Sequence, residues 1–128
     1  IKISKLHFNL IDELLAGVDS LEIQRELAEK KRKLLNFKEI EEVEVPQIVN
    51  AQLREYQKEG YKWLNFLSEF SCGGCLADDM GLGKTLQVLT LLQNRKTQQP
   101  NSVHLVVVPT TLIFNWQAEV EKFCPSLR

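Results

Sequence analysis

The sequence predicts an α/β fold, with part of a parallel β-sheet flanked by helices and preceded by a small helical segment. A short apolar run at 71–77 enters a glycine-containing turn, and a long apolar helical segment then begins at Lys84. A second run, 103–108, is apolar without alternation, which is typical of a strand covered on both faces of a parallel sheet. Strand, helix, strand and helix in this order predict a βαβα unit with a right-handed crossover.

Composition indicates an ordinary globular protein. The chain has 128 residues, 44% of them apolar and 26% charged, and its net charge is −1. This balance gives no general attraction to nucleic acid or to an anionic membrane, so a nucleic-acid partner has to be sought in local motifs. No apolar run approaches the length of a membrane span and no leader opens the chain, so we expect an intracellular, soluble protein without a membrane partner.

The three cysteines fit a reducing compartment better than a disulfide framework. Cys72 and Cys75 have the spacing of metal ligands, but a second ligand pair is absent, and His7 and His104 do not form one. We therefore favour buried thiols beside the first strand over a zinc site.

Residues 1–45 are predicted to form a helical N-terminal segment, the end of an upstream accessory region. A weak strand pattern at 1–8 is followed by helical patterns at 9–18 and 19–37. For the basic run at 30–33 we favour a solvated helix face over a nucleic-acid contact. The acidic stretch 39–46 ends in a proline and is the best candidate for a linker, so the second domain is predicted at 46–128.

Three further helices are expected in the second domain. The first covers 51–70, with an apolar stripe in which Gly60 marks a close packing contact, and spacing alone makes Gln57 a solvated polar residue. The second, 84–95, is apolar on most sides and should be buried. Thr110 or Thr111 can cap the third. The residues expected to face inward are Leu53, Tyr56, Trp63, Leu64 and Leu67, then Leu86, Val88, Leu89, Leu91 and Leu92, then Ile113, Trp116, Val120 and Phe123.

Residues 78–85, which we call the phosphate loop, have the pattern of an anion-binding turn. Gly81 and Gly83 can adopt backbone angles closed to other residues, so consecutive N–H groups can turn toward one anion beside a helix N-terminus. Lys84 supplies a positive charge for the outer phosphates and the Thr85 hydroxyl a ligand for Mg²⁺. Asp78 stands where the usual pattern has glycine. The alternative is a plain glycine turn with a solvated lysine.

Three stretches together resemble the Q-motif, motif I and motif Ia of Swi/Snf-type ATPases in helicase superfamily 2. They are Leu53–Gly60 with Trp63-Leu64, Leu76–Gln87, and Val106–Leu112 with Asn115-Trp116 and Lys122-Phe123. The resemblance covers roughly residues 46–127 and implies the first part of a RecA-like ATP-binding lobe. It also accounts for Asp78, since this family normally has an acidic residue there. Glu55 departs from it, because the family usually has proline at that position.

The resemblance implies roles for individual residues. Gln57 would hydrogen-bond the adenine edge, Lys84 would contact the β- and γ-phosphates, and Thr85 would bind Mg²⁺. Trp116 is kept as a core residue. The backbone that would hold the phosphates of ATP is contributed by Asp79, Met80, Gly81, Leu82, Gly83, Lys84 and Thr85, and the residues that would face the DNA backbone are Pro109, Thr110 and Thr111.

The implied function is that of a DNA-dependent ATPase or translocase, which couples ATP hydrolysis to movement on double-stranded DNA and to remodelling of protein–DNA complexes. Its location would be the cytoplasm or nucleoid in a bacterium and the nucleus in a eukaryote. The family's Walker B acids and arginine fingers are not in this sequence, so we expect an ATP-site fragment that is inactive alone. We also expect the two strands to be under-covered, and the N-terminal helices or a second copy to cover them.

Two other classes remain open. A different P-loop protein, such as a kinase or a GTPase, would also place an apolar helix after the loop, and a GTPase would favour GTP over ATP. A non-catalytic module could instead use helices within 9–37 to dock a partner.

Overall fold

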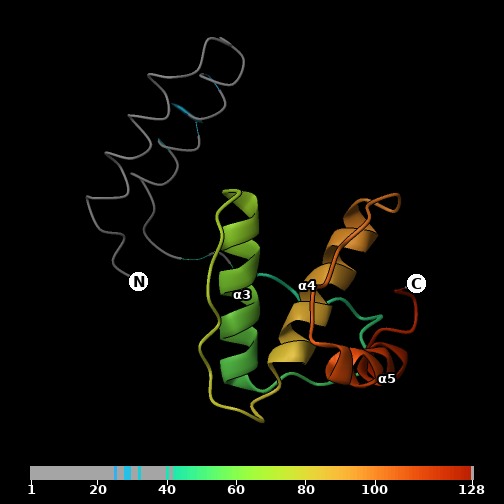
Figure 1. The fold of residues 1–128 in the computed structure, drawn as a ribbon. Helices are drawn as coiled ribbons and strands as arrows, with labels where there is room; N and C mark the ends of the chain where they lie inside the picture. Colours follow the sequence, from blue (N-terminus) through green and yellow to red (C-terminus); the bar gives the residue numbers. More distant parts are fainter. Residues whose placement is uncertain (1–24, 26–27, 30–31, 33–39, 41, 128) are drawn as a thin grey trace. The chain divides into compact units, whose positions relative to one another are not determined.

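The computed structural model describes residues 25, 28–29, 32, 40 and 42–127. The chain divides into two compact units, 1–39 and 40–128. The second unit contains, in its described part, the helices α3 (Glu55–Glu69), α4 (Lys84–Gln98) and α5 (Ile113–Phe123) and the 3-10 helix η1 (Thr110–Leu112) (Figure 1). None of the helices described is long and apolar enough to cross a bilayer.

The strand and helices predicted within 1–37 lie outside the described residues, apart from four positions. Residues 25, 28, 29 and 32 are helical and exposed. Of the basic run at 30–33, the structure describes only Arg32, which is exposed, so the interpretation of the run as a whole stays a prediction.

The predicted α/β class is wrong for the part of the chain that the structure describes, which is helical and contains no strand. Segments 72–79 and 103–108 have no regular secondary structure, and no backbone hydrogen bond joins one of them to the other within 42–127. The first segment lies along α3, where Gly74 is in close contact with Trp63 and Leu67, and the second borders α4 and α5. An extended segment becomes a strand only through hydrogen bonds to another, and these two lie against different helices.

Helix α3 begins at Glu55. At this position the Swi/Snf-type ATPases that the sequence resembles usually have proline. Glutamate at the first helical position favours the positive end of the helix dipole, and its carboxylate accepts a hydrogen bond from Lys58 Nζ at 2.7 Å. This contact holds the pKa of Glu55 below its ordinary value. The backbone N–H of Arg54 donates to Gln57 Oε1 at 2.9 Å, as in a capping box. Glutamate in place of proline is therefore compatible with a helix that starts at residue 55.

The face of α3 that is buried differs from the predicted apolar stripe. Besides Leu53 just before the helix, the buried residues are Gln57, Tyr61 and Asn65, whereas Tyr56 is exposed. These three residues recur every four positions and therefore share one face. Their polar groups have partners: Asn65 Nδ2 donates to the Tyr61 carbonyl at 2.8 Å, and Asn94 Nδ2 donates to Asn65 Oδ1 at 3.0 Å. Hydropathy missed this face because two of its three residues are amides, whose burial is made possible by hydrogen bonds.

The core lies between α3, α4 and the end of α5. It is built on Val49, Leu53, Tyr61, Leu86, Leu89 and Cys124, with Trp116, Val120 and Phe123 packed partly buried around it. In α4, Leu86 and Leu89 are buried as predicted, while Val88, Leu91 and Leu92 are only partly so. In α5, Ile113 is 41% exposed and no residue is fully buried. The predicted inward faces of α4 and α5 are thus only partly covered.

Residues 42–51, interpreted in part as a linker, pack onto this core. Val43, Val45 and Ala51 contact the buried cluster, and the Asn50 N–H donates to the Phe123 carbonyl at 2.8 Å. Lys62 of α3 pairs with Glu42 at 2.6 Å and with Glu59 at 2.8 Å. These carboxylates raise the pKa of Lys62. The stretch before α3 is therefore part of the second unit's packing.

The cysteines divide into two kinds. Cys72 and Cys75 are free and exposed, so the prediction of buried thiols is wrong, because the segment that contains them is not inside a sheet. No group of three metal-ligating side chains occurs among the described residues. Cys124 is buried, its Sγ lies 3.8 Å from the Leu89 carbonyl oxygen, and burial raises its pKa to about 11.

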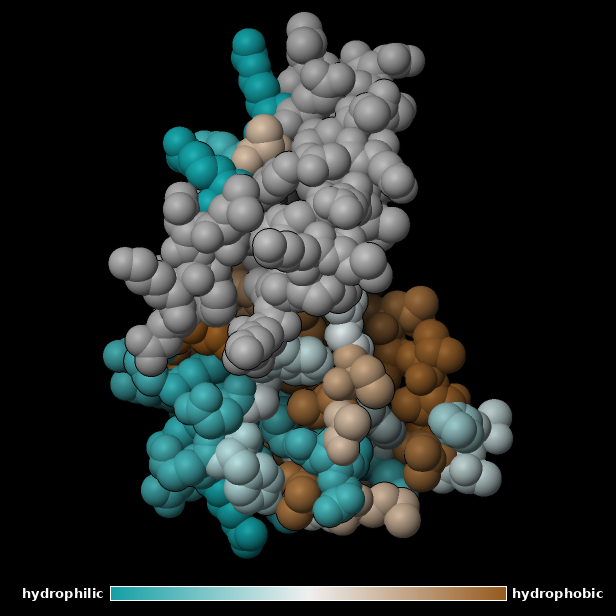
Figure 2. Space-filling view, turned by 90° about the vertical axis from the view of Figure 1, so that its left-hand side faces the viewer, coloured by the Kyte–Doolittle hydropathy of each residue, from teal (hydrophilic) through white to brown (hydrophobic). Residues whose placement is uncertain are grey.

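The unpaired segment 103–108 leaves apolar surface open. Val103, Leu105 and Val107 are 93%, 88% and 84% exposed, whereas Val106 is 40% exposed. Figure 2 shows apolar surface gathered at one edge of the described part. This exposure is what an extended apolar segment without a partner produces.

Candidate functional site

The phosphate loop has the backbone geometry that the sequence predicts for it. Gly81 has φ 85° and Gly83 has φ 74°, both in the left-handed region that favours glycine. Gly83 is also the N-cap of α4, so the free N–H groups of that helix begin directly after the loop. The first turn of α4 contains no acidic side chain. The turn therefore presents the positive end of a helix dipole beside two glycines.

The Lys84 side chain folds back over the loop. Its ammonium donates to the carbonyl oxygens of Asp78 at 2.6 Å and Asp79 at 2.9 Å. A positive charge is thus held beside the turn by backbone acceptors, from which it can be withdrawn by a stronger anionic partner. Thr85 follows in the first turn of α4 and is partly buried, while Asp79 and Met80 are exposed.

Gln57 is not the solvated residue that spacing suggested. It is 7% exposed, and its Nε2 donates to the Leu82 carbonyl at 3.1 Å, while its Oε1 accepts from Arg54. A Cβ added at Gly83 would lie 2.5 Å from Gln57 Nε2, so Gly83 is required for close approach as well as for its φ angle. The structure therefore brings Gln57 of α3 against the last turn of the phosphate loop.

Gln87 is a residue that sequence reasoning passed over. It is fully buried in α4, one turn beyond Lys84, and its Nε2 donates to Asp78 Oδ2 at 3.2 Å. Its Oε1 has no hydrogen-bond partner and lies against Gly60 of α3, where an added Cβ would be only 1.9 Å away. The signal available in the sequence was an amide between the apolar residues Leu86 and Val88, together with a glycine inside the preceding helical stretch.

A pocket of about 430 Å³ opens beside Gln57 and Gly83. Its apolar walls come from Leu86 of α4 and from Ala118 and Phe123 of α5, and its charged rim from Glu119 and Lys122. The Lys122 ammonium lies 4.8 Å from the Phe123 ring centroid, a cation–π distance. The pocket is therefore apolar with convergent polar groups, and it adjoins the phosphate loop through Gly83.

Pro109, Thr110 and Thr111 lie elsewhere. All three are exposed, at the start of η1, which runs directly into α5. Neither threonine caps α5, because that helix continues from η1 without a side-chain cap. Within 42–127, no hydrogen bond joins these residues to the phosphate loop.

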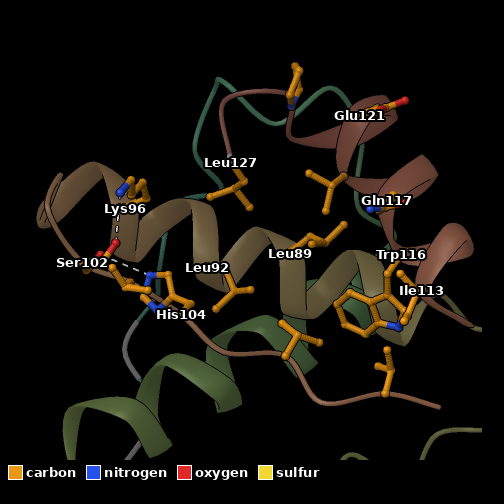
Figure 3. A pocket seen from close by; sticks show the side chains of 15 residues that line it. Leu89, Leu92, Lys96, Ser102, His104, Ile113, Trp116, Gln117, Glu121 and Leu127 are labelled. Atoms are coloured by element: carbon orange, nitrogen blue, oxygen red, sulfur yellow. Dashed lines mark hydrogen bonds between the residues drawn. The ribbon is translucent and has the colours of Figure 1, made fainter. Parts of the chain in front are cut away.

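A larger pocket, about 1030 Å³, lies between α4, α5 and segment 103–108 (Figure 3). Most of its walls are apolar, and Leu89, Leu92 and Trp116 contribute to them. Ser102 Oγ lies 3.2 Å from His104 Nε2, and Lys96 Nζ donates to the Ser102 carbonyl at 3.0 Å. No hydrogen bond in the described range joins His104 to a carboxylate, so this pair lacks the third group of a nucleophilic triad. The pocket is space left beside an uncovered segment.

Comparison with known proteins decides the family. The model of the SNF2-related domain matches residues 56–128. This chain belongs to the SNF2-related family. The resemblance to Swi/Snf-type proteins of helicase superfamily 2 is therefore confirmed, and it rests on more than the phosphate loop, because the match begins in α3.

Two curated relatives extend the match. The chain is 42% identical over 119 residues to Helicase ssl-1 of Caenorhabditis elegans, which covers 86% of this chain and 5% of that protein. It is 39% identical over 121 residues to a putative ATP-dependent helicase/translocase, YwqA, of Bacillus subtilis, covering 93% of this chain and 13% of the relative. Both relatives are named as helicases, so they give no support to the alternative that the chain is a kinase or a GTPase. The chain spans only a small part of their length.

A solved structure agrees with this family. The SWI2/SNF2 ATPase core of Sulfolobus solfataricus, in complex with dsDNA, matches with a TM-score of 0.64 and 41% identity. The match covers 69% of this chain and 19% of that one. The arrangement of the SNF2-related part of the chain is thus similar to a region of a known ATPase core.

Proposed function

We propose that this chain is the ATP-binding part of a Swi/Snf-type DNA-dependent ATPase that couples ATP hydrolysis to movement on DNA and to remodelling of protein–DNA complexes. The observation that supports it best is the phosphate loop, where two left-handed glycines, the N-terminus of α4 and the Lys84 ammonium converge. Family membership and relatives named as helicases and as an ATPase core support the same proposal.

The phosphate chain of ATP would be held by backbone N–H groups of 79–85. Lys84 would exchange its carbonyl partners for the β- and γ-phosphate oxygens, which is favourable because the acceptors become anionic. The Thr85 hydroxyl would be a ligand of Mg²⁺, which supplies neutralisation of the phosphate charge when bound. The exposed loop and the N-terminus of α4 fit this set of ligands.

The adenine would lie in the 430 Å³ pocket beside Gln57 and Gly83. Gln57 Nε2 uses one N–H for the Leu82 carbonyl and keeps a second, which can donate to a ring nitrogen of the base. The Phe123 ring and the Leu86 side chain give the apolar surface against which a base packs. Gln57 would thereby connect recognition of the base to the position of the phosphate loop.

Pro109, Thr110 and Thr111 would contact a DNA backbone. Their exposure at the beginning of η1 leaves hydroxyl groups and helix N–H groups available to a phosphate, without reading bases. The similar solved structure from Sulfolobus solfataricus is an ATPase core in complex with dsDNA, which supports double-stranded DNA as the partner.

Nucleotide titration tests the proposal. The purified chain is titrated with Mg·ATP and with Mg·GTP, and we expect tighter binding of ATP, with the difference reduced in Gln57→Ala. Equal affinities, or a preference for GTP, would refute the ATP assignment. In the same preparation we expect ATP turnover no faster than that of a Lys84→Ala control, because the residues assigned to the site would bind the phosphates and Mg²⁺ but none of them would position the attacking water.

A further inference from the structure

We propose that Gln87 is a positioning residue that holds the start of the phosphate loop in its binding-competent shape, an inference that rests on the proposed ATP site and deepens it. Its Nε2 donates to Asp78 Oδ2 at 3.2 Å, and the carbonyl of the same Asp78 accepts from Lys84 at 2.6 Å. One residue therefore connects the buried amide to the ammonium that would meet the phosphates.

The orientation of the Gln87 amide is determined by its partner. The Asp78 carboxylate only accepts hydrogen bonds, so the atom facing it has to be the nitrogen. The carbonyl oxygen then points toward Gly60, where no donor is available and where only a glycine leaves room. A fully buried acceptor without a partner is unfavourable for folding. An apolar side chain of the same length would avoid this cost, so folding alone does not explain a glutamine at this position.

Within the phosphate loop, the turn from Asp78 to Leu82 is held at both of its ends in matching ways. Gln87 of α4 binds Asp78 and lies against Gly60 of α3, and Gln57 of α3 binds the Leu82 carbonyl and lies against Gly83, the N-cap of α4. Each helix thus contributes a buried amide that packs on a glycine at the other. The turn between Asp78 and Leu82 is consequently fixed at both ends while its middle stays exposed.

A structural role and a positioning role predict opposite results for Gln87→Met, which keeps the length of the side chain but removes the amide. If Gln87 positions the loop, the melting temperature should stay the same or rise, because the unpartnered carbonyl is gone. Amide exchange at 79–82 should accelerate about tenfold, because the hydrogen bond to Asp78 is lost. ATP affinity should fall about tenfold, whereas adenosine affinity should stay within about twofold, because only phosphate contacts depend on the loop.

Gln93→Met is the matched control. Gln93 is also buried in α4, at 3% exposed, but its Oε1 accepts from Ser126 Oγ at 2.6 Å, away from the loop. This variant should lower the melting temperature and leave loop exchange and ATP affinity unchanged. Gly60→Ala should reproduce the effect of Gln87→Met on the loop, since its Cβ would displace Gln87 Oε1. In a Gln87→Ala background it should have no further effect on the loop.

The results separate this inference from the proposed function. Equal losses of adenosine and ATP affinity in Gln87→Met, or a lower melting temperature with unchanged exchange at 79–82, would overturn the positioning role. A wild-type chain that binds no adenine nucleotide, but whose loop exchange still responds to Gln87→Met, would refute the proposed function while leaving the coupling between Gln87 and the loop in place.

Discussion

Replacing Gly83 with alanine tests the geometry of the phosphate loop. The substitution would strain a left-handed backbone angle and would also place a Cβ against Gln57, whereas Gly81→Ala and Gly73→Ala allow the two effects to be measured apart. Gly83 has φ 74°, and a Cβ there would lie 2.5 Å from Gln57 Nε2. Gly81 has φ 85° with nothing within 4 Å of an added Cβ. Gly73 is outside the left-handed region and also has open space. Together they form a graded series of alanine substitutions.

The expected magnitudes follow from these contacts. Gly73→Ala should be neutral or stabilise by up to about 1 kcal/mol, since alanine restricts the unfolded chain. Gly81→Ala should cost about 1–2 kcal/mol for a left-handed alanine. Gly83→Ala should cost that amount and a further ~1–3 kcal/mol, because Gln57 has to leave the Leu82 carbonyl. The total, about 2–5 kcal/mol, is a large part of the stability of a small domain.

The assay is urea unfolding followed by the fluorescence of Trp63 and Trp116, with the m-value as a check that the transition stays two-state. Equal destabilisation by Gly83→Ala and Gly81→Ala would show that the contact with Gln57 contributes nothing. A Gln57→Ala background should remove the extra cost of Gly83→Ala, since the atom it collides with is absent.

Other expectations concern thiols, charge and association. Folded chain treated with a thiol reagent should show fast reaction at Cys72 and Cys75 and reaction at Cys124 only on unfolding; equal rates at all three would contradict the burial of Cys124. Because burial raises the Cys124 pKa from 9.0 to about 11, the folded state keeps a proton that the unfolded state releases. The contribution of this group to the free energy of unfolding should therefore be constant below about pH 9 and fall between about pH 9 and 11, and Cys124→Ala should make the measured fall smaller. The open segment 103–108 predicts concentration-dependent self-association in sedimentation, and a compact monomer at high concentration would count against it.

The phosphate loop was predictable from the sequence because its chemistry is local. The left-handed angles of Gly81 and Gly83 and the start of α4 at Lys84 are marked by the glycines and the helical pattern of the sequence itself. The family was predictable for the same reason, since three short stretches in the right order identify it. The roles assigned to individual site residues stay predictions.

What could not be predicted depends on contacts between distant segments. The apolar runs at 71–77 and 103–108 have the composition of strands, but strand formation requires a partner that hydropathy does not reveal, and each run lies along a helix instead. Spacing wrongly predicted that Gln57 is solvated, and Gln87 was given no role. An amide side chain is expected at the surface unless its hydrogen-bond partner is known, and here the partners are 25 and 9 residues away.

The central claim, that the phosphate loop binds ATP through Lys84, is tested most directly by titrating Mg·ATP into Lys84→Ala and a matched Lys96→Ala. Lys96 lies in the same helix and donates to the Ser102 carbonyl at 3.0 Å, beside the larger pocket. Loss of a charge-assisted phosphate contact worth about 1.5–3 kcal/mol should weaken binding roughly 10- to 100-fold in Lys84→Ala, and Lys96→Ala should bind like the wild type. Equal ATP affinity in the wild type and in Lys84→Ala would contradict the account.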